Sequence, residues 1–289
     1  MAASLPPGPR MTYIIGDVRD RARLRRAFDG ASIVVHAAAL KTVPAGERHV
    51  SEFKQTNIDG TENVVNAAID CGVGRSLFIS SDKACQPVNE YGKCKAVGEG
   101  LFIQGNALGV SRGCRFAVVR GGNVWGSNGS VLTKWGECRA AGLPITVAGP
   151  ETTRFHLPMD SWIDFCHHAV ESMTGGEIFI PKARAWRLGD LAEAYAAPTL
   201  TLGARGGDKL HETLIGTNES PRAIDAGWAF IIEPSPNLRE VWNYKPHAGL
   251  SVDWLYIGAT YTSDTADRMT IDELRELLSN TTAFDGGMR

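Results

Sequence analysis

The sequence predicts an α/β protein built on a doubly wound parallel sheet and joined to a smaller, mixed α/β lobe. Over the first 120 residues, short apolar runs typical of buried strands alternate with longer segments of helical periodicity. Strands that alternate with helices favour a parallel sheet covered by helices on both faces. After about residue 121, glycine, proline and aromatic residues become frequent and the periodic segments shorten. We therefore expect one domain over 1–120 and a second lobe over 121–289, with a stretch near 155–185 returning to the first domain.

Each element of this alternation has its own signal in the sequence. In chain order we predict a strand at 13–18, a helix at 20–28, a strand at 32–38, a helix at 57–71, a strand at 77–81, a helix from Tyr91 and a strand at 116–120. The strands are apolar runs, whereas the helices show a helical spacing of apolar or charged residues. The stretch 271–278 predicts a terminal helix with a cap near Thr270.

Composition and charge exclude several classes of function. The chain has 289 residues, of which 43% are apolar and 21% charged, and its net charge is −2. So small a net charge draws the protein neither to nucleic acid nor to an anionic membrane, and no apolar run is long enough to cross a bilayer. Residues 1–10 lack the apolar core of a signal peptide. We therefore expect a cytoplasmic protein with no nucleic-acid partner and no membrane partner.

The six cysteines and seven histidines are scattered along the chain. No two cysteines have C-x-x-C spacing, so their pattern matches neither a zinc site nor a disulfide framework. We expect reduced thiols and no metal site.

Side chains capable of proton chemistry gather between residues 80 and 95. Ser81, Asp82 and Lys83 directly follow an apolar strand, and Tyr91 and Lys95 are spaced to share one face of a helix. A free tyrosine has a pKa of about 10, and a nearby cation would favour the phenolate and make it a better base. A serine, a tyrosine and a lysine suit hydride transfer at an alcohol carbon, and Asp82 with Lys83 adds the acid and base of an elimination. The alternative for this last pair is a solvated ion pair in an exposed turn.

Other polar positions have a plain structural interpretation beside the functional one. Asp17 suits a contact with an adenine amino group or, equally, a solvated turn. The small residues at 37–39 leave room for a ligand, or they simply pack tightly after a strand. Arginine in the segment 205–212 suits phosphate, and the segments 120–126 and 153–155 supply further polar and aromatic groups. Taken singly, each of these three segments favours an exposed surface over a site.

A glycine-rich phosphate loop is not found in this sequence. In dinucleotide-binding folds, G-x-G-x-x-G follows the first strand and lets the backbone approach the pyrophosphate at a helix N-terminus. This chain contains only Gly72-Val73-Gly74, which precedes a strand, and Leu77 stands where the last glycine belongs. We interpret this stretch as an ordinary loop.

Taken together, the motifs resemble the extended short-chain dehydrogenase/reductase family. Within it, the chain is similar to the C5-inverting UDP-N-acetylglucosamine 4,6-dehydratases of pseudaminic acid synthesis, in the polysaccharide biosynthesis protein family. The likeness covers nearly the whole chain. It rests on 16–20, 36–41, 56–58, 80–84, Tyr91-Gly92-x-x-Lys95, 120–124, 153–155, 175–182 and 209–212.

The resemblance implies a Rossmann-like fold and a reaction with no net redox change. Tyr91 would deprotonate the sugar 4-hydroxyl as hydride leaves C4, and Lys83 would then remove the C5 hydrogen. Asp82 would protonate the departing 6-hydroxyl before the hydride returns to C6. Ser81 stands where the family usually has threonine and keeps its hydroxyl, while Lys95 would orient the cofactor ribose and tune the tyrosine.

The resemblance also assigns binding residues and partners. The expected cofactor is NADP, with NAD as the alternative, and its residues are Asp17, Val18, Ala37, Ala38, Ala39, Lys41, Asn57, Tyr91 and Lys95. The expected substrate is UDP-N-acetylglucosamine or a similar UDP-sugar, bound by Lys41, Asn123, Arg154, Arg205 and Glu212. We also expect a homo-oligomer.

One departure leaves the function open between alternatives. The family's first β-α-β unit, with its glycine-rich turn, has no counterpart in this sequence, so the Rossmann-like domain is expected to be N-terminally incomplete. A shortened dehydratase is the leading hypothesis. The alternatives are a non-catalytic UDP-sugar-binding or assembly subunit and a related nucleotide-sugar epimerase, although an epimerase needs no elimination acid and base.

Overall fold

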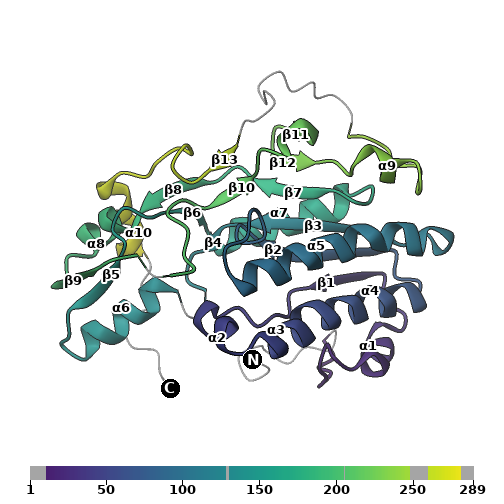
Figure 1. Cartoon of the computed structure of the whole chain (residues 1–289), viewed down its shortest axis with the longest axis horizontal. Coiled ribbons are helices and arrows are strands. Elements are labelled where there is room, and N and C mark those ends of the chain that lie inside the picture. The colour runs from purple at the N-terminus through teal and green to yellow at the C-terminus, as the bar shows by residue number, and fades with distance from the viewer. Residues whose placement is uncertain (1–10, 128–129, 205, 248–259, 281–289) are drawn as a thin grey trace.

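A six-stranded sheet forms the centre of the protein, in a computed structural model that describes residues 11–127, 130–204, 206–247 and 260–280. The strand order is β1-β2-β3-β7-β12-β11 (Figure 1). The strands are β1 (Ile33–His36), β2 (Arg75–Ser81), β3 (Arg115–Gly121), β7 (Ile178–Pro181), β12 (Ala229–Ile232) and β11 (Ala223–Asp225). The first four run parallel, and β12 is antiparallel to both of its neighbours. The predicted parallel α/β sheet is therefore confirmed.

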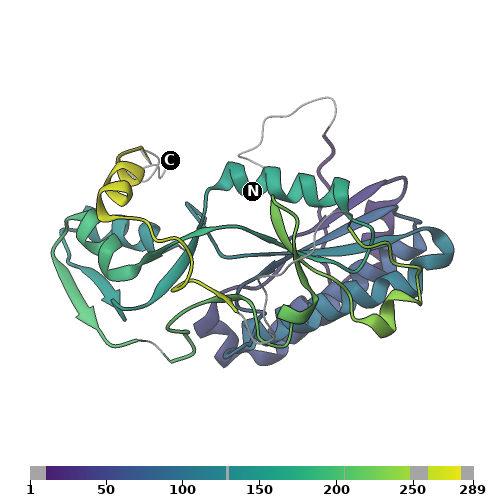
Figure 2. The same ribbon diagram turned by 90° about the horizontal axis from the view of Figure 1, so that it is seen from above.

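Helices cover both faces of this sheet, as Figure 2 shows. On one face lie α4 (Gly60–Asp70) and α5 (Glu90–Gly109), and on the other lies α7 (Met159–Ser172). The α5 helix packs closely against the sheet, and two glycines allow this approach. A Cβ at Gly98 or Gly105 would come within 2.9 Å of the Phe78 or Phe116 ring, respectively. Shorter helices precede α4, namely α1 (Arg21–Phe28), α2 (Val43–Arg48), α3 (Val50–Lys54) and the π-helical turn Gln55–Asp59.

The predicted strand at 13–18 is wrong. The backbone there forms no strand, and Tyr13, Ile14 and Ile15 are exposed. An apolar run becomes a strand only where a neighbouring strand completes its hydrogen bonds, and no described strand lies beside this segment. On β1, the strand at the sheet edge, Ile33 and Val35 are 50% and 52% exposed.

A second apolar cluster lies around Trp135 and Leu191, apart from the large sheet. Its residues come mainly from α6 (Val131–Ala140), β5 (Ile145–Ala148), α8 (Leu188–Tyr195) and α10 (Ile271–Asn280), and the exposed strand β9 (Thr199–Leu202) pairs with β5. The predicted cap of α10 is confirmed, since the Glu273 amide donates to Thr270 Oγ1 at 3.2 Å.

Two small sheets connect the large sheet to the apolar cluster around Trp135 and Leu191. One consists of β4 (Asn123–Val124), β6 (Thr153–Leu157) and β8 (Arg184–Arg187), and the other of β10 (Thr213–Ile215) and β13 (Tyr261–Thr262). Three short helices remain, at Val110–Arg112, at Ser220–Arg222 and as α9 at Pro236–Arg239. None of the described helices combines the length and apolar character that a bilayer-crossing segment needs.

Candidate active site

The turn at 82–85 leaves the carboxyl end of β2, in the middle of the sheet. Ser81, the last residue of β2, pairs with Gly121 of β3, and the Asp82 amide donates to the Gly121 carbonyl at 2.8 Å. The turn closes where the Ala84 amide donates to the Ser81 carbonyl at 2.9 Å. Ligands of open α/β sheets bind at such strand ends, so the turn presents its side chains where a substrate would lie.

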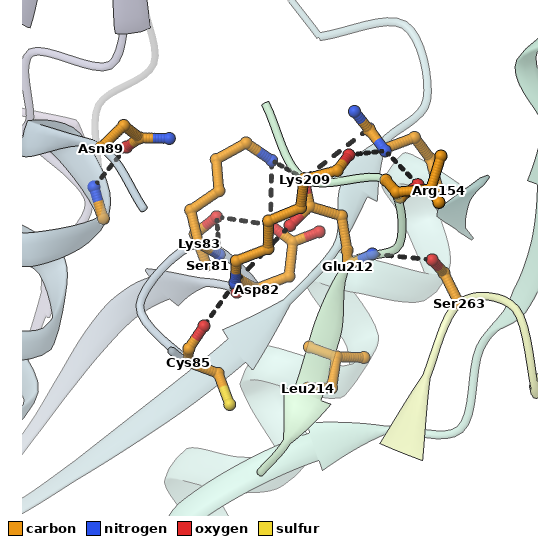
Figure 3. A network of polar contacts seen from close by, with 12 residues as sticks. Ser81, Asp82, Lys83, Cys85, Asn89, Arg154, Lys209, Glu212, Leu214 and Ser263 are labelled. Atoms are coloured by element: carbon orange, nitrogen blue, oxygen red, sulfur yellow. Dashed lines mark hydrogen bonds and ion pairs between the residues drawn. The ribbon is translucent and has the colours of Figure 1, made fainter. Parts of the chain in front are cut away.

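Lys83 lies between two buried carboxylates (Figure 3). Its Nζ donates to Asp82 Oδ1 at 3.0 Å and is 3.2 Å from Glu212 Oε1. Asp82 is fully buried, and its Oδ1 also accepts a hydrogen bond from Ser81 Oγ at 2.9 Å. Burial lowers the pKa of Lys83, but the two carboxylates outweigh it and raise that pKa above its ordinary value. The lysine is therefore a cation in this arrangement, and the alternative of an exposed, solvated ion pair is excluded.

One oxygen of each carboxylate is left without a hydrogen-bond partner among the described residues. These buried atoms are Asp82 Oδ2 and Glu212 Oε2. Burial, followed by repulsion from Asp82, raises the pKa of Glu212, although Lys83, Arg154 and Lys209 oppose the shift. A buried acceptor with no donor costs about 1–3 kcal/mol. The cluster therefore favours a bound group that donates a hydrogen bond, or a proton on one of the carboxyls.

Tyr91 lies in the first turn of α5, next to the turn at 82–85. Asn89 caps this helix by accepting a hydrogen bond from the Gly92 amide at 2.8 Å. Glycine is needed at position 92, since a Cβ there would collide with the Lys83 carbonyl oxygen. Burial raises the pKa of Tyr91 to about 12, against the opposing effects of the Lys83 charge and a hydrogen bond with Ser81.

Lys95 lies one turn after Tyr91 on α5 and contacts β2 directly. Its Nζ donates to the Ile79 carbonyl at 2.7 Å and lies 4.4 Å from the centre of the Phe78 ring. Burial lowers the pKa of Lys95 to about 8. Among the groups that shift the pKa of Tyr91, the cation is Lys83. The tuning of the tyrosine by Lys95 stays a prediction.

Several of the residues predicted to hold the cofactor lie in or beside the loop that follows β1. Ala37 and Ala38 are exposed directly after β1. Asn57 is buried and bonds both the amide and the carbonyl of Leu40 at 2.8 Å, so it fixes the backbone of this loop. Lys41 is exposed at the end of the same loop.

Asp17 and Val18 precede α1. Asp17 is exposed, and a hydrogen bond from Arg19 lowers its pKa to about 2. Val18 is half-buried and packs against the backbone of Gly60, where a Cβ would overlap it. The assignment of both residues to the cofactor stays a prediction.

The predicted substrate residues do not all lie together. Arg154 of β6 points to the Lys83 cluster, with its Nε 3.6 Å from Glu212 Oε1. Glu212 lies just before β10 and is 1% exposed, whereas Asn123 of β4 is exposed. Arg205 lies outside the described residues.

The sequence did not predict a second buried ionic cluster, which lies around Arg120. It favoured an exposed surface for the segment 120–126, which begins with this arginine. In the structure Arg120 is 2% exposed and bonds Glu99 and Glu219 at distances down to 2.6 and 2.8 Å. The expectation was wrong because Arg120, which the predicted strand at 116–120 already includes, continues the buried strand β3 and meets its carboxylate partners inside the protein. The apolar run 116–119 immediately before it was the available signal.

The described residues contain no group of three or more histidine, cysteine, aspartate or glutamate side chains placed to hold a metal ion. All six cysteines, which the structure describes, are free thiols.

Comparisons with known proteins agree with this geometry. A family model described as polysaccharide biosynthesis protein matches residues 8–234. The chain is 38% identical over 291 residues to the UDP-N-acetylglucosamine 4,6-dehydratase (inverting) of Campylobacter jejuni, across 98% of this chain and 86% of that protein. It is 33% identical over 276 residues to the UDP-glucose 4-epimerase of Rickettsia rickettsii, across 93% of this chain and 80% of that protein. The solved structure of Pen from Bacillus thuringiensis has a TM-score of 0.82 and 32% identity, across 92% of this chain and 80% of that one.

Proposed function

Since this chain belongs to the polysaccharide biosynthesis protein family, we propose that it is a nucleotide-sugar dehydratase acting on UDP-N-acetylglucosamine. The product would be a UDP-4-keto-6-deoxy-hexosamine, with inversion at C5. The observation that carries this proposal is the buried Asp82–Lys83 pair beside Tyr91, at the carboxyl end of the parallel sheet. A dehydration needs one group to take a proton from carbon and another to give a proton to the leaving oxygen, and this pair supplies both.

The ion pair is one proton transfer away from the state that the elimination requires. Lys83 Nζ donates to Asp82 Oδ1 at 3.0 Å, so a proton can pass along that hydrogen bond. The transfer would leave a neutral amine to remove the C5 proton and a carboxylic acid to protonate the 6-hydroxyl as water. The pair as a whole neither gains nor loses a proton. The amine takes one proton from C5, and the carboxylic acid gives one proton to the leaving hydroxyl group.

Tyr91 would remove the proton of the sugar 4-hydroxyl, and Ser81 would bond the same oxygen. With its pKa raised to about 12, the phenol is protonated at neutral pH, so it needs additional positive charge to act as a base. When bound, a nicotinamide cofactor would supply such a charge, accept the hydride from C4 and return it to C6 after the loss of water. The cofactor is proposed to be NADP, with NAD as the alternative.

The described residues fit the nicotinamide end of such a cofactor. Ala37 and Ala38 are exposed directly after β1. Their side chains are single methyl groups, so they leave room beside the carboxyl ends of β1 and β2. Lys95 extends from α5 to the Ile79 carbonyl of β2, where its amine would also bond the ribose, and Asn57 holds the loop that carries the alanines. We propose that Asp17, Val18 and Lys41 bind the adenine side of the cofactor. The UDP-sugar would be bound by Lys41, Asn123, Arg154, Arg205 and Glu212.

We also propose a cytoplasmic homo-oligomer with a cofactor domain at 1–120 and a UDP-sugar lobe at 121–289. The exposed apolar side chains of Ile33 and Val35 on β1 support self-association. Light scattering of the purified chain tests the oligomer, and a monomer at all concentrations would contradict it.

A related 4-epimerase is the rival function, favoured by the 33% identity to the Rickettsia enzyme. An epimerase leaves the mass of the nucleotide sugar unchanged, whereas a dehydratase removes one water. Incubation of the chain with UDP-N-acetylglucosamine, with and without NADP⁺ or NAD⁺, followed by mass spectrometry, separates the two. NMR of product formed in deuterated water reports whether C5 has exchanged and inverted. An unchanged substrate under every condition, with UDP-sugar binding retained, would instead indicate a non-catalytic subunit.

A further inference from the structure

A strap of chain from the second half of the protein, Gly207–Glu212, lies against both elements that carry the catalytic side chains. At its start, Asn89 at the α5 N-terminus donates to the Gly207 carbonyl at 2.9 Å. At its end, Glu212 faces Lys83 at 3.2 Å. The strap thus touches the helix of Tyr91 and the turn of Asp82 and Lys83.

Lys209, in the middle of the strap, points into the catalytic turn (Figure 3). Its Nζ donates to the Asp82 carbonyl at 3.3 Å and to the Cys85 carbonyl. Both carbonyls belong to a turn and lie outside the β2 strand. One ammonium group therefore joins the first and last residues of the turn that positions Asp82 and Lys83.

The strap is itself anchored to β6. The Thr153 amide donates to the Leu210 carbonyl at 3.0 Å, and Arg154 Nη1 donates to the Lys209 carbonyl at 3.1 Å. The Lys209 side chain is only 10% exposed, so its position is defined by these contacts and not by solvent. The catalytic turn is consequently tied to the strand that carries a predicted substrate residue.

We propose that Lys209 is a positioning residue that holds the catalytic turn, through the carbonyl groups of Asp82 and Cys85, in the geometry needed for elimination. The proposal rests on the proposed dehydratase function. Its ammonium group donates to the main chain of the turn and lies 4.0 Å from Glu212 Oε2, so we assign its effect to the placement of the turn and of Glu212 and not to a contact with the sugar. A shift of about 1 Å in a reacting group can cost about 100-fold in rate, so a loosened turn would reduce turnover more than binding.

The test compares the full-length wild type with Lys209→Met, Lys209→Arg and a control, Lys182→Met. Methionine keeps much of the side-chain length and removes the donor, whereas arginine can donate to the same two carbonyls. Lys182 is a matched control because it also lies in the second half and forms an ion pair, with Asp225 at 2.7 Å. We would measure kcat and KM for water loss and the deuterium uptake of the peptide covering 81–87.

We expect Lys209→Met to lower kcat about 10- to 100-fold with KM changed less than about three-fold, because the hydrogen bonds of a charged donor are lost. Uptake in 81–87 should rise while uptake in β3 stays at the wild-type level. Lys209→Arg should recover most of both properties, and Lys182→Met should match the wild type.

Unchanged uptake in 81–87, or an increase spread over the whole chain, would overturn the positioning role. So would a normal kcat in Lys209→Met. If the wild type itself releases no water, the proposed function fails, but deuterium uptake still decides whether Lys209 holds the turn.

Discussion

Two buried ionic clusters lie on neighbouring strand ends, and they differ in how completely their hydrogen bonds are made. In the Arg120 cluster, the guanidinium donates to Glu99 at 3.0 and 2.6 Å, to Glu219 at 2.8 Å, and to the Leu214 carbonyl at 2.8 Å. In the Lys83 cluster, two carboxylate oxygens, Asp82 Oδ2 and Glu212 Oε2, lack a donor among the described residues.

The difference separates a structural network from a reactive one. A buried charge is tolerated when all its partners are present, and the Arg120 network meets that condition without any ligand. The Lys83 cluster leaves acceptors unpaired and holds its lysine in a protonation state opposite to the one that a base requires. The Arg120 network needs no further donor, whereas the unpaired oxygens of Asp82 and Glu212 are candidate contacts for a bound ligand.

The largest expected effect is on catalysis in the Lys83 cluster. Asp82→Asn removes the acid of the elimination while keeping the side-chain size, so the rate of water loss should fall about 10²- to 10⁴-fold. The unfolding free energy should change far less than the rate does, because Glu212 still faces Lys83 at 3.2 Å. Steady-state kinetics and thermal melts of the same samples check this. A variant with normal turnover would remove Asp82 from the proposed mechanism.

The next effect is on stability in the Arg120 cluster. Arg120→Met leaves Glu99 and Glu219 buried without their cation, which typically costs about 3–5 kcal/mol of unfolding free energy. Urea denaturation measures that loss. The control is Arg275→Met, whose ion pairs with Asp272 at 2.7 Å and Glu193 at 3.9 Å are exposed and should contribute no more than about 1 kcal/mol. Equal losses in the two variants would contradict the structural role of the Arg120 network.

A smaller effect concerns the acid stability of the same network. Burial raises the pKa of Glu219, but hydrogen bonds and charge from Arg120 outweigh it, so the folded-state pKa is below the ordinary 4.5. The stabilisation is therefore complete above pH 4.5 and is lost as the pH falls through the lower folded-state pKa. Denaturation curves between pH 7 and pH 3 should show a shallower acid loss for Glu219→Gln than for wild type. Parallel curves would show that Glu219 titrates alike in the folded and unfolded chain.

The smallest expected effect comes from the edge of the Arg120 network. Ser80 Oγ donates to Glu99 Oε1 at 2.6 Å, and the same oxygen still accepts from Arg120 Nε at 3.0 Å in Ser80→Ala. We expect a loss of about 1 kcal/mol in urea denaturation, since a neutral donor is removed while the charged one remains. A loss as large as that of Arg120→Met would mean that the serine, and not the arginine, satisfies Glu99.

Local spacing was enough to predict much of the site. Tyr91 and Lys95 do lie on one helix, Ser81 ends a buried strand, and Asp82 and Lys83 directly follow it. These predictions depend only on the period of a helix and the end of an apolar run, which are local properties. The strand predicted at 13–18 failed because a strand also needs a neighbour, and the sequence of the strand does not state whether one is beside it.

The amino-acid sequence by itself determined the alternation of strands and helices, the spacing of the side chains capable of proton chemistry between 81 and 95, and the family likeness. Only the tertiary structure decided what surrounds them. Glu212 and Lys209 lie more than a hundred residues from Asp82 in the chain, yet one faces Lys83 and the other holds its turn. Such contacts arise where the second half of the chain folds back over the sheet. Neither the spacing of residues nor the composition predicts which distant residues will meet in this way. The charge state of Lys83 follows from those distant neighbours, since burial and partner charges set a pKa.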